Sequence, residues 1–219
     1  MLAALTLREQ ALGHSQGGGA LPLAAATAGG IAGVVMLAAP IAARGEVFSG
    51  SMRQQLVSAG MPADAAGRVV AATSRWMEGR ARQAEASTVT PLREAAVAAF
   101  RDAGWSAEQA QGAVAALDNP MLLSMYDAPL DADLLRSGAP VLAVYGGADT
   151  IVPPEVCVPA ASRALAGHRD ALVLLVPGMP HGMERTGPVP PPRPGAEPED
   201  GMSPVLVSAV QHWLVHHLH

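Results

Sequence analysis

The chain has 219 residues, which is enough for one domain or for one domain with an inserted second unit. Half of the residues are hydrophobic and 15% are charged, a composition typical of a folded protein with a packed core. The formal net charge is −5 and no basic run is present, which argues against a nucleic-acid partner. All 14 residues counted as Lys or Arg are arginines, so chemistry that depends on a lysine side chain is excluded.

The compartment is inferred from cysteine usage and from the first residues. Cys157 is the only cysteine, so an internal disulfide is excluded and a reducing compartment is favoured. Residues 1–13 lack the pattern of a signal peptide. We therefore expect a cytoplasmic protein. Residues 17–43 carry no charge and are long enough to span a membrane. Glycines and Pro22 interrupt this run, which favours a buried helix followed by a central strand.

The first predicted elements surround a serine. Residues 7–12 are weakly strand-like and lead into residues 13–17 (Gly-His-Ser-Gln-Gly). This G-x-S-x-G pattern is typical of a nucleophile elbow, a sharp turn from strand to helix with the serine at its apex. We expect the glycines on both sides of Ser15 to be required, because a Cβ at either place would strike the neighbouring strand or helix. A helix is predicted over 15–28, and the apolar run 31–38 predicts a parallel strand covered on both faces.

Residues 46–126 predict four or five helices. Thr90 and Pro91 have the pattern of a helix start, and Ser106 with Gln109 has the pattern of a capping box at the next one. These helices are inserted between two predicted strands. Two interpretations remain open: a cap over a site carried by the strands, or a second layer of the core.

Strands and helices alternate again after the helical segment. Residues 140–145 and 171–176 predict strands, and residues 153–166 and 203–218 predict helices that begin near a proline. Six prolines lie between residues 188 and 198, and this composition favours a surface loop over a proline-rich ligand for a partner domain. The last helix ends in a group of histidines: His212, His216, His217 and His219. A solvated helix end is favoured over a metal site, since no cysteine or carboxylate stands at ligand spacing.

Acyl transfer by a serine needs a base, a carboxylate that orients the base, and donors for the oxyanion. Ser15 is the candidate nucleophile, and the backbone N–H of Gln16 is the candidate oxyanion donor. His181 is the candidate base because it lies in a Gly/Pro-rich loop after a predicted strand. Asp149 is the candidate acid because it follows the strand 140–145, at the carboxyl end where catalytic groups of parallel sheets gather.

Other titratable residues are less suitable for these roles. Asp127, Asp131 and Asp133 precede the strand 140–145 and are expected at the opposite end of the sheet. His14 is too close to the turn of the elbow to act as the base for Ser15. His168 lies in a polar turn before a strand.

Three segments together resemble bacterial α/β-hydrolase esterases, including those near dienelactone hydrolases and serine aminopeptidases. They are residues 13–18, residues 140–153 and the turn 178–182; Thr186-Gly187 and Ser203-Pro204 before the helix of Trp213 add to the likeness. The order Ser, Asp, His along the chain is the order of the α/β-hydrolase triad. The resemblance implies Ser15 as nucleophile, Asp149 as acid and His181 as base, with no cofactor and no metal.

One departure from the family is large. The elbow of these hydrolases lies in the middle of the domain, whereas here it begins at residue 13. We therefore expect a partial α/β-hydrolase fold that lacks the usual N-terminal half, which would supply the second oxyanion donor. Residues 7–12 would then form an exposed sheet edge, which favours pairing with a second copy of the chain.

The predicted organisation has three parts. Residues 1–45 carry the elbow, 46–128 form a helical cap, and 129–219 carry the acid and the histidine, in a mostly parallel sheet of about four strands flanked by helices. The predicted function is serine hydrolysis of a small-molecule carboxylic ester through an acyl-enzyme, without a nucleic-acid or membrane partner. Three alternatives remain: cleavage of amides or peptides, acyl transfer to an alcohol, and a non-catalytic fragment that keeps the triad residues.

Overall fold

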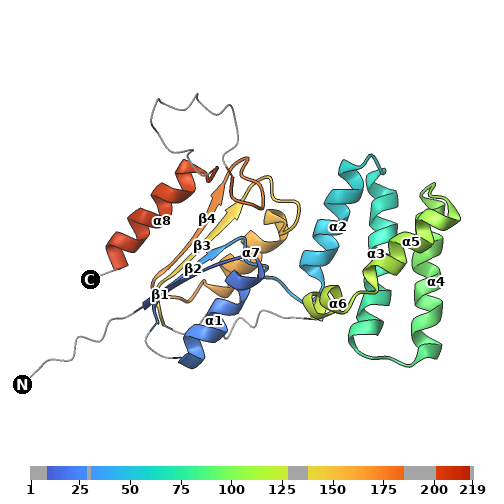
Figure 1. The fold of residues 1–219 in the computed structure, drawn as a ribbon, viewed down its shortest axis with the longest axis horizontal. Coiled ribbons are helices and arrows are strands. Elements are labelled where there is room, and N and C mark those ends of the chain that lie inside the picture. The colour runs from blue at the N-terminus through green and yellow to red at the C-terminus, as the bar shows by residue number, and fades with distance from the viewer. Residues whose placement is uncertain (1–8, 29–30, 128–137, 185–200, 218–219) are drawn as a thin grey trace, which may run out of the picture. The chain divides into compact units, whose positions relative to one another are not determined.

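The computed structural model describes residues 9–28, 31–127, 138–184 and 201–217. The chain divides into two compact units (Figure 1). Met1–Ile41 and Leu130–His219 form the first, which we call the α/β unit, and Ala42–Pro129 form the second, which we call the helical unit. Each is described by itself. The cap role predicted for residues 46–128 concerns both units and stays a prediction.

A four-stranded parallel sheet forms the centre of the α/β unit. Its strands lie side by side in chain order: β1 (Glu9–His14), β2 (Ile31–Leu37), β3 (Val141–Gly146) and β4 (Ala171–Val176). The inner strands are apolar and buried, β3 along its whole length and β2 from its third residue onward. This arrangement confirms the predicted parallel sheet of about four strands. Strand β1 extends two residues beyond its predicted end because its pairing with β2 continues to His14 and Leu37.

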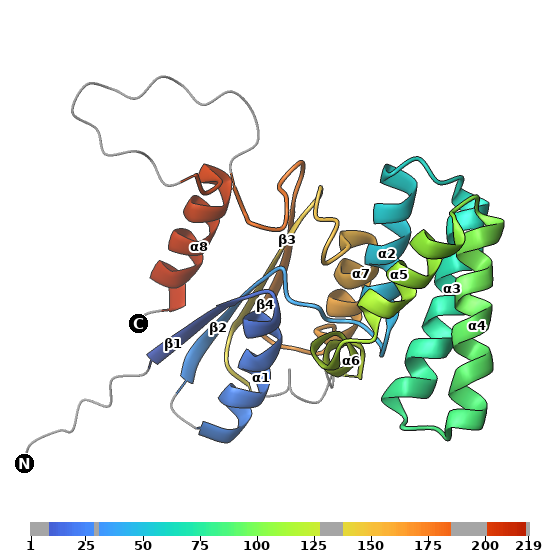
Figure 2. The same cartoon turned by 45° about the vertical axis from the view of Figure 1, so that its right-hand side comes forward.

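Helices cover both faces of the sheet. Helices α1 (Gln16–Ala28) and α7 (Pro154–Ala164) lie on one face and α8 (Pro204–His217) lies on the other, as both views show (Figures 1 and 2). Gly33 in β2 lets α8 approach the sheet, since a Cβ at Gly33 would lie 2.8 Å from the Trp213 ring. The buried indole of Trp213 therefore packs directly against the strand.

The helical unit contains α2 (Glu46–Ser58), α3 (Ala63–Ala81), α4 (Ala86–Asp102), α5 (Ala107–Leu117) and α6 (Pro120–Asp127). These helices have a hydrophobic core of their own, which includes Trp76, Met77 and Phe100. Ser106 and Gln109 form the predicted capping box at the start of α5.

The prediction that a helix starts at Thr90 and Pro91 is wrong. Helix α4 starts at Ala86, and Pro91 lies inside it. The first turn is already formed upstream, where the N–H groups of Thr88 and Val89 donate to the carbonyl oxygen of Glu85 at 2.8 and 3.0 Å. A proline near the start of a helix removes only one hydrogen bond, so the helix continues through it.

Several sequence predictions fall outside the described residues. These are the proline-rich segment 188–198, Asp131, Asp133 and His219. Within the described ranges, no helix is both long and apolar enough to cross a membrane. Strand β1 lies at one edge of the described sheet, and its Leu12 side chain is 56% exposed. Pairing of this edge with a second copy stays a prediction.

Candidate active site

Ser15 lies at the junction between β1 and α1, in the predicted elbow. Its φ angle is 55°, in the left-handed region that residues other than glycine rarely adopt. Two backbone hydrogen bonds hold this conformation: the Ser15 N–H donates to Leu37 O at 2.8 Å, and the Gly19 N–H donates to Ser15 O at 3.1 Å. The elbow is thus tied both to the neighbouring strand and to its own helix. The cost of the strained backbone is met by these surroundings.

The glycines around Ser15 have different roles. A Cβ at Gly13 would lie 2.6 Å from the Gly17 carbonyl group, which confirms that this position requires glycine. A Cβ at Gly17 would meet nothing within 4 Å, so the expectation for Gly17 is wrong. Gly18 is the second glycine that the turn requires, because its Cβ would lie 2.8 Å from the carbonyl oxygen of Gly13. One helical residue is a rotation of about 100°, and it is Gly18 that faces the strand.

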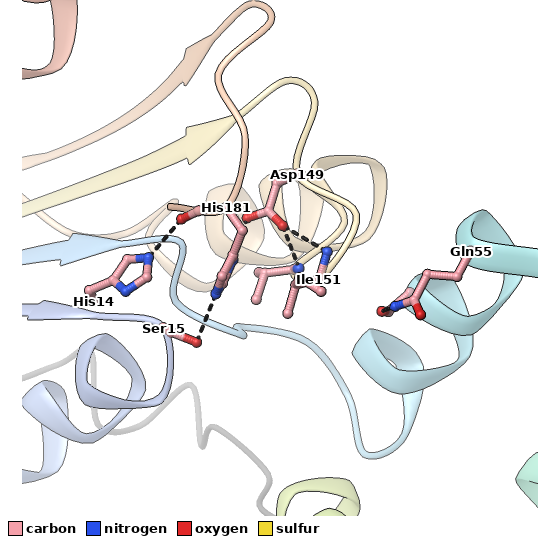
Figure 3. Close-up of polar contacts among 8 residues, drawn as sticks. His14, Ser15, Gln55, Asp149, Ile151 and His181 are labelled. Atoms are coloured by element: carbon pink, nitrogen blue, oxygen red, sulfur yellow. Dashed lines mark hydrogen bonds and ion pairs between the residues drawn. The ribbon is translucent and has the colours of Figure 1, made fainter. Parts of the chain in front are cut away.

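His181 connects the serine to the acid (Figure 3). It lies in the loop after β4, and its Nε2 is 3.2 Å from Ser15 Oγ while its Nδ1 is 2.8 Å from Asp149 Oδ2. A carboxylate oxygen only accepts, so Nδ1 carries the proton in this arrangement. Nε2 of the neutral ring then accepts the hydrogen bond from the Ser15 hydroxyl, which is the orientation that a general base needs.

Asp149 is buried and held by the backbone of its own turn. The residue is 1% exposed, and its Oδ1 accepts hydrogen bonds from the N–H groups of Ile151 and Val152, both at 2.8 Å (Figure 3). These contacts leave Oδ2 for the His181 ring. Sequence analysis missed the two backbone donors. An Asp that starts a turn and bonds the N–H two residues ahead is a known local pattern, so a signal for them was present.

The sheet brings these three residues together. Ser15 follows β1, Asp149 follows β3 and His181 follows β4, and the register aligns the carboxyl ends of the strands at one edge. Two hydrogen bonds join the turn of Asp149 to the loop of His181: the Gly147 N–H donates to Val176 O at 2.8 Å, and the Ala148 N–H donates to Met179 O at 3.0 Å. The acid and the base therefore move as one piece.

Other polar groups lie beside this arrangement. Gln16 is the first residue of α1, so its N–H has no acceptor within the helix. The His14 ring lies 4.8 Å from the His181 ring, centroid to centroid, and its Nε2 is 2.7 Å from the carbonyl oxygen of His181. Sequence analysis excluded His14 as a base and assigned it no other part. The local sequence holds no signal for this contact because its partner lies 167 residues away.

No group of three or more His, Cys, Asp or Glu side chains suited to a metal ion occurs among the residues that the structure describes. Burial raises the pKa of Tyr145, on β3, and the nearby Cys157 adds to the effect. The Tyr145 side chain therefore stays a neutral phenol, and His181 is the base that the geometry offers to Ser15.

A parallel sheet with helices on both faces, a strained serine between the first strand and helix, and an acid and a histidine after the last two strands define the class of fold. The α/β unit is part of an α/β-hydrolase fold. No protein-family model matches the chain. No curated protein matches it in sequence.

Solved structures with a similar chain path include three hydrolase-like proteins. A monoacylglycerol lipase from Paleococcus ferrophilus is 19% identical with a TM-score of 0.40, over 94% of this chain and 67% of that one. A bromoperoxidase from Bacillus anthracis is 18% identical with a TM-score of 0.40, over 82% and 63%. An alpha/beta hydrolase from Sphaerobacter thermophilus is 15% identical with a TM-score of 0.39, over 92% and 67%. The chain thus spans 63 to 67% of their lengths.

Proposed function

We propose that this chain is a serine hydrolase that cleaves carboxylic esters, with Ser15 as nucleophile, His181 as base and Asp149 as the acid that orients the base. The proposal depends on one observation: an unbroken line of hydrogen bonds from a buried carboxylate, through a histidine, to a serine held in a strained elbow. A left-handed serine costs about 1–3 kcal/mol, and such strain is concentrated at functional sites.

Acylation follows from the positions of these groups. His181 Nε2 takes the hydroxyl proton of Ser15 as Oγ attacks the ester carbonyl carbon. The Gln16 N–H and the positive end of α1 stabilise the negative charge that develops on the carbonyl oxygen. The imidazolium then gives its proton to the departing alcohol, and the acyl group remains on Ser15. Asp149 keeps the proton on Nδ1 and stabilises the imidazolium.

Deacylation uses the same groups with a water molecule as the nucleophile. His181 takes a proton from water as its oxygen attacks the acyl carbon. Collapse of the second tetrahedral intermediate breaks the bond to Ser15 Oγ, which recovers its proton from His181 while the carboxylic acid leaves. Each cycle consumes one ester and one water and regenerates the neutral histidine.

Hydrolysis of p-nitrophenyl acetate and p-nitrophenyl butyrate by the full chain tests the proposal. We expect turnover that Ser15→Ala abolishes and that Ser208→Ala, a substitution of an exposed serine on α8, leaves unchanged. A p-nitroanilide of the same acid, run in parallel, separates ester from amide cleavage. Turnover that persists in Ser15→Ala, or a folded wild-type chain without turnover, would contradict the proposal.

A further inference from the structure

The strongest unexplained contact in the α/β unit joins the residue before the serine to the residue that faces the serine. His14 is the last residue of β1, and its Nε2 is 2.7 Å from the backbone carbonyl oxygen of His181 (Figure 3). A carbonyl oxygen only accepts, so His14 Nε2 carries a proton and donates it. His14 is an exposed residue, yet its ring is oriented by this bond and by the contact with the His181 ring.

This contact closes a ring of interactions around the elbow. Ser15 Oγ meets the side chain of His181 at 3.2 Å, while the preceding residue meets the backbone of His181 at 2.7 Å. Two adjacent residues of one strand end therefore hold the same loop residue at two points. The separation between Ser15 Oγ and His181 Nε2 depends on both contacts, because the ring position follows from the backbone position.

The loop of His181 needs such a support. It follows β4 without regular secondary structure, and Met183 within it has a φ angle of 64°. Its other backbone ties join Ala148 to Met179 at 3.0 Å and Ser203 to Met183 at 2.9 Å, on either side of His181. In the described part of the chain, the bond from His14 is the one that joins the backbone of His181 to the strand carrying the nucleophile.

We propose that His14 is a positioning residue that holds the His181 loop at the distance from Ser15 that proton transfer requires. This inference rests on the proposed function for its effect on catalysis, though not for its effect on the loop. His14 itself takes no proton from Ser15, since its Nε2–H is already donated to the carbonyl group. A misplacement of about 1 Å in a catalytic group can reduce the rate a hundredfold, which sets the scale of the effect.

The test compares His14→Leu, which has no donor, with His14→Gln, which carries an N–H donor at a similar distance from its Cβ. For p-nitrophenyl butyrate we expect His14→Leu to lower kcat by about tenfold to a hundredfold with little change in KM. His14→Gln is expected to restore most of the rate. His212→Leu, the same substitution at an exposed histidine of α8, is the matched control and is expected to retain the wild-type rate.

A second measurement does not need turnover. The Nδ1 proton that His181 donates to Asp149 gives a low-field NMR signal, identified by its loss in His181→Ala. We expect this signal in the wild type and in His14→Gln, and its loss through faster exchange with water in His14→Leu. An unchanged signal in His14→Leu, or its loss in His14→Gln as well, would overturn the positioning role. If no variant hydrolyses esters, the proposed function fails, while the NMR comparison still decides the role of His14.

Discussion

The carbonyl group of Met179 lies directly against the α-carbon of Gly146, so closely that no side chain fits between them. Gly146 ends β3 just before the turn of Asp149, and Met179 lies in the loop just before His181. The contact is between two backbones and cannot be relieved by rotating a side chain. It sets how near the acid and the base approach each other.

Gly146→Ala is therefore expected to damage both stability and activity. The added methyl group must push the two loops apart, and such overpacking costs about 1–3 kcal/mol of unfolding free energy. Urea unfolding measures the loss of stability, and ester hydrolysis measures the separation of Asp149 from His181. Gly167→Ala is the matched control, because a Cβ at Gly167 meets no atom within 4 Å. Equal stability of the two variants would contradict the packing argument.

The two glycines of the elbow motif are expected to respond differently to the same change. Gly13→Ala places a methyl group against the backbone of Gly17 and is expected to lose about 1–3 kcal/mol. Gly17→Ala adds a methyl group in open space within α1, where alanine is favoured over glycine by up to about 1 kcal/mol. We expect Gly17→Ala to match or exceed the wild type in urea unfolding. A larger loss for Gly17→Ala than for Gly13→Ala would show that the elbow is built in another way.

Asp149→Asn is expected to keep the fold and lose the reaction. The amide oxygen can accept from Ile151 and Val152 as Oδ1 does now, which directs the amide NH₂ group toward His181 Nδ1. The ring must then carry its proton on Nε2, where it cannot accept from Ser15. Loss of the correct tautomer in a serine protease costs about 10⁴ in kcat, and we expect a fall of similar order. Near-wild-type hydrolysis by Asp149→Asn would remove the acid from the mechanism.

Stability is expected to depend on pH through the end of α8. His217 Nδ1 is 2.7 Å from Trp213 O and its Nε2 is 3.1 Å from Asp170 Oδ1, so both bonds form together only when the ring is doubly protonated. The hydrogen bond to Trp213, with that to Asp170, raises the pKa of His217 above its ordinary value. Its contribution to stability is therefore full below about pH 6.5, the unfolded value, and is lost as the pH rises through the raised folded pKa.

A double-mutant cycle with His217→Gln and Asp170→Asn measures this contribution. Asp170 is 53% exposed, so we expect a coupling of about 0.2–1 kcal/mol at pH 5.5, as for exposed ion pairs. At pH 9 the coupling is expected to be smaller. A coupling that grows between pH 5.5 and pH 9 would contradict the doubly protonated ring.

The sequence was sufficient where local pattern and topology act together. The apolar runs predicted β2, β3 and β4, and the carboxyl ends of parallel strands meet at one edge. For this reason the sequence predicted that Ser15, Asp149 and His181 would lie close together, and the structure places them within hydrogen-bond distance. Their catalytic roles stay a proposal.

What the sequence could not supply depends on contacts between distant segments. The bond between His14 and His181 spans 167 residues, and that between Asp170 and His217 spans 47, with no local signal for either. The error at Gly17 has another cause, since the motif names the glycine and not the face of the helix on which it lies. Only the helix phase shows that Gly18 faces the strand.

The central claim is that Ser15 is an activated nucleophile, and a fluorophosphonate probe tests it most directly. The serine oxygen attacks phosphorus and fluoride leaves, so labelling requires an activated serine and no knowledge of the substrate. Peptide mass spectrometry is expected to locate the adduct on Ser15 in the wild type, with no adduct in Ser15→Ala or His181→Ala. A folded wild-type chain that remains unlabelled, or an adduct on Ser15 that persists in His181→Ala, would contradict the account.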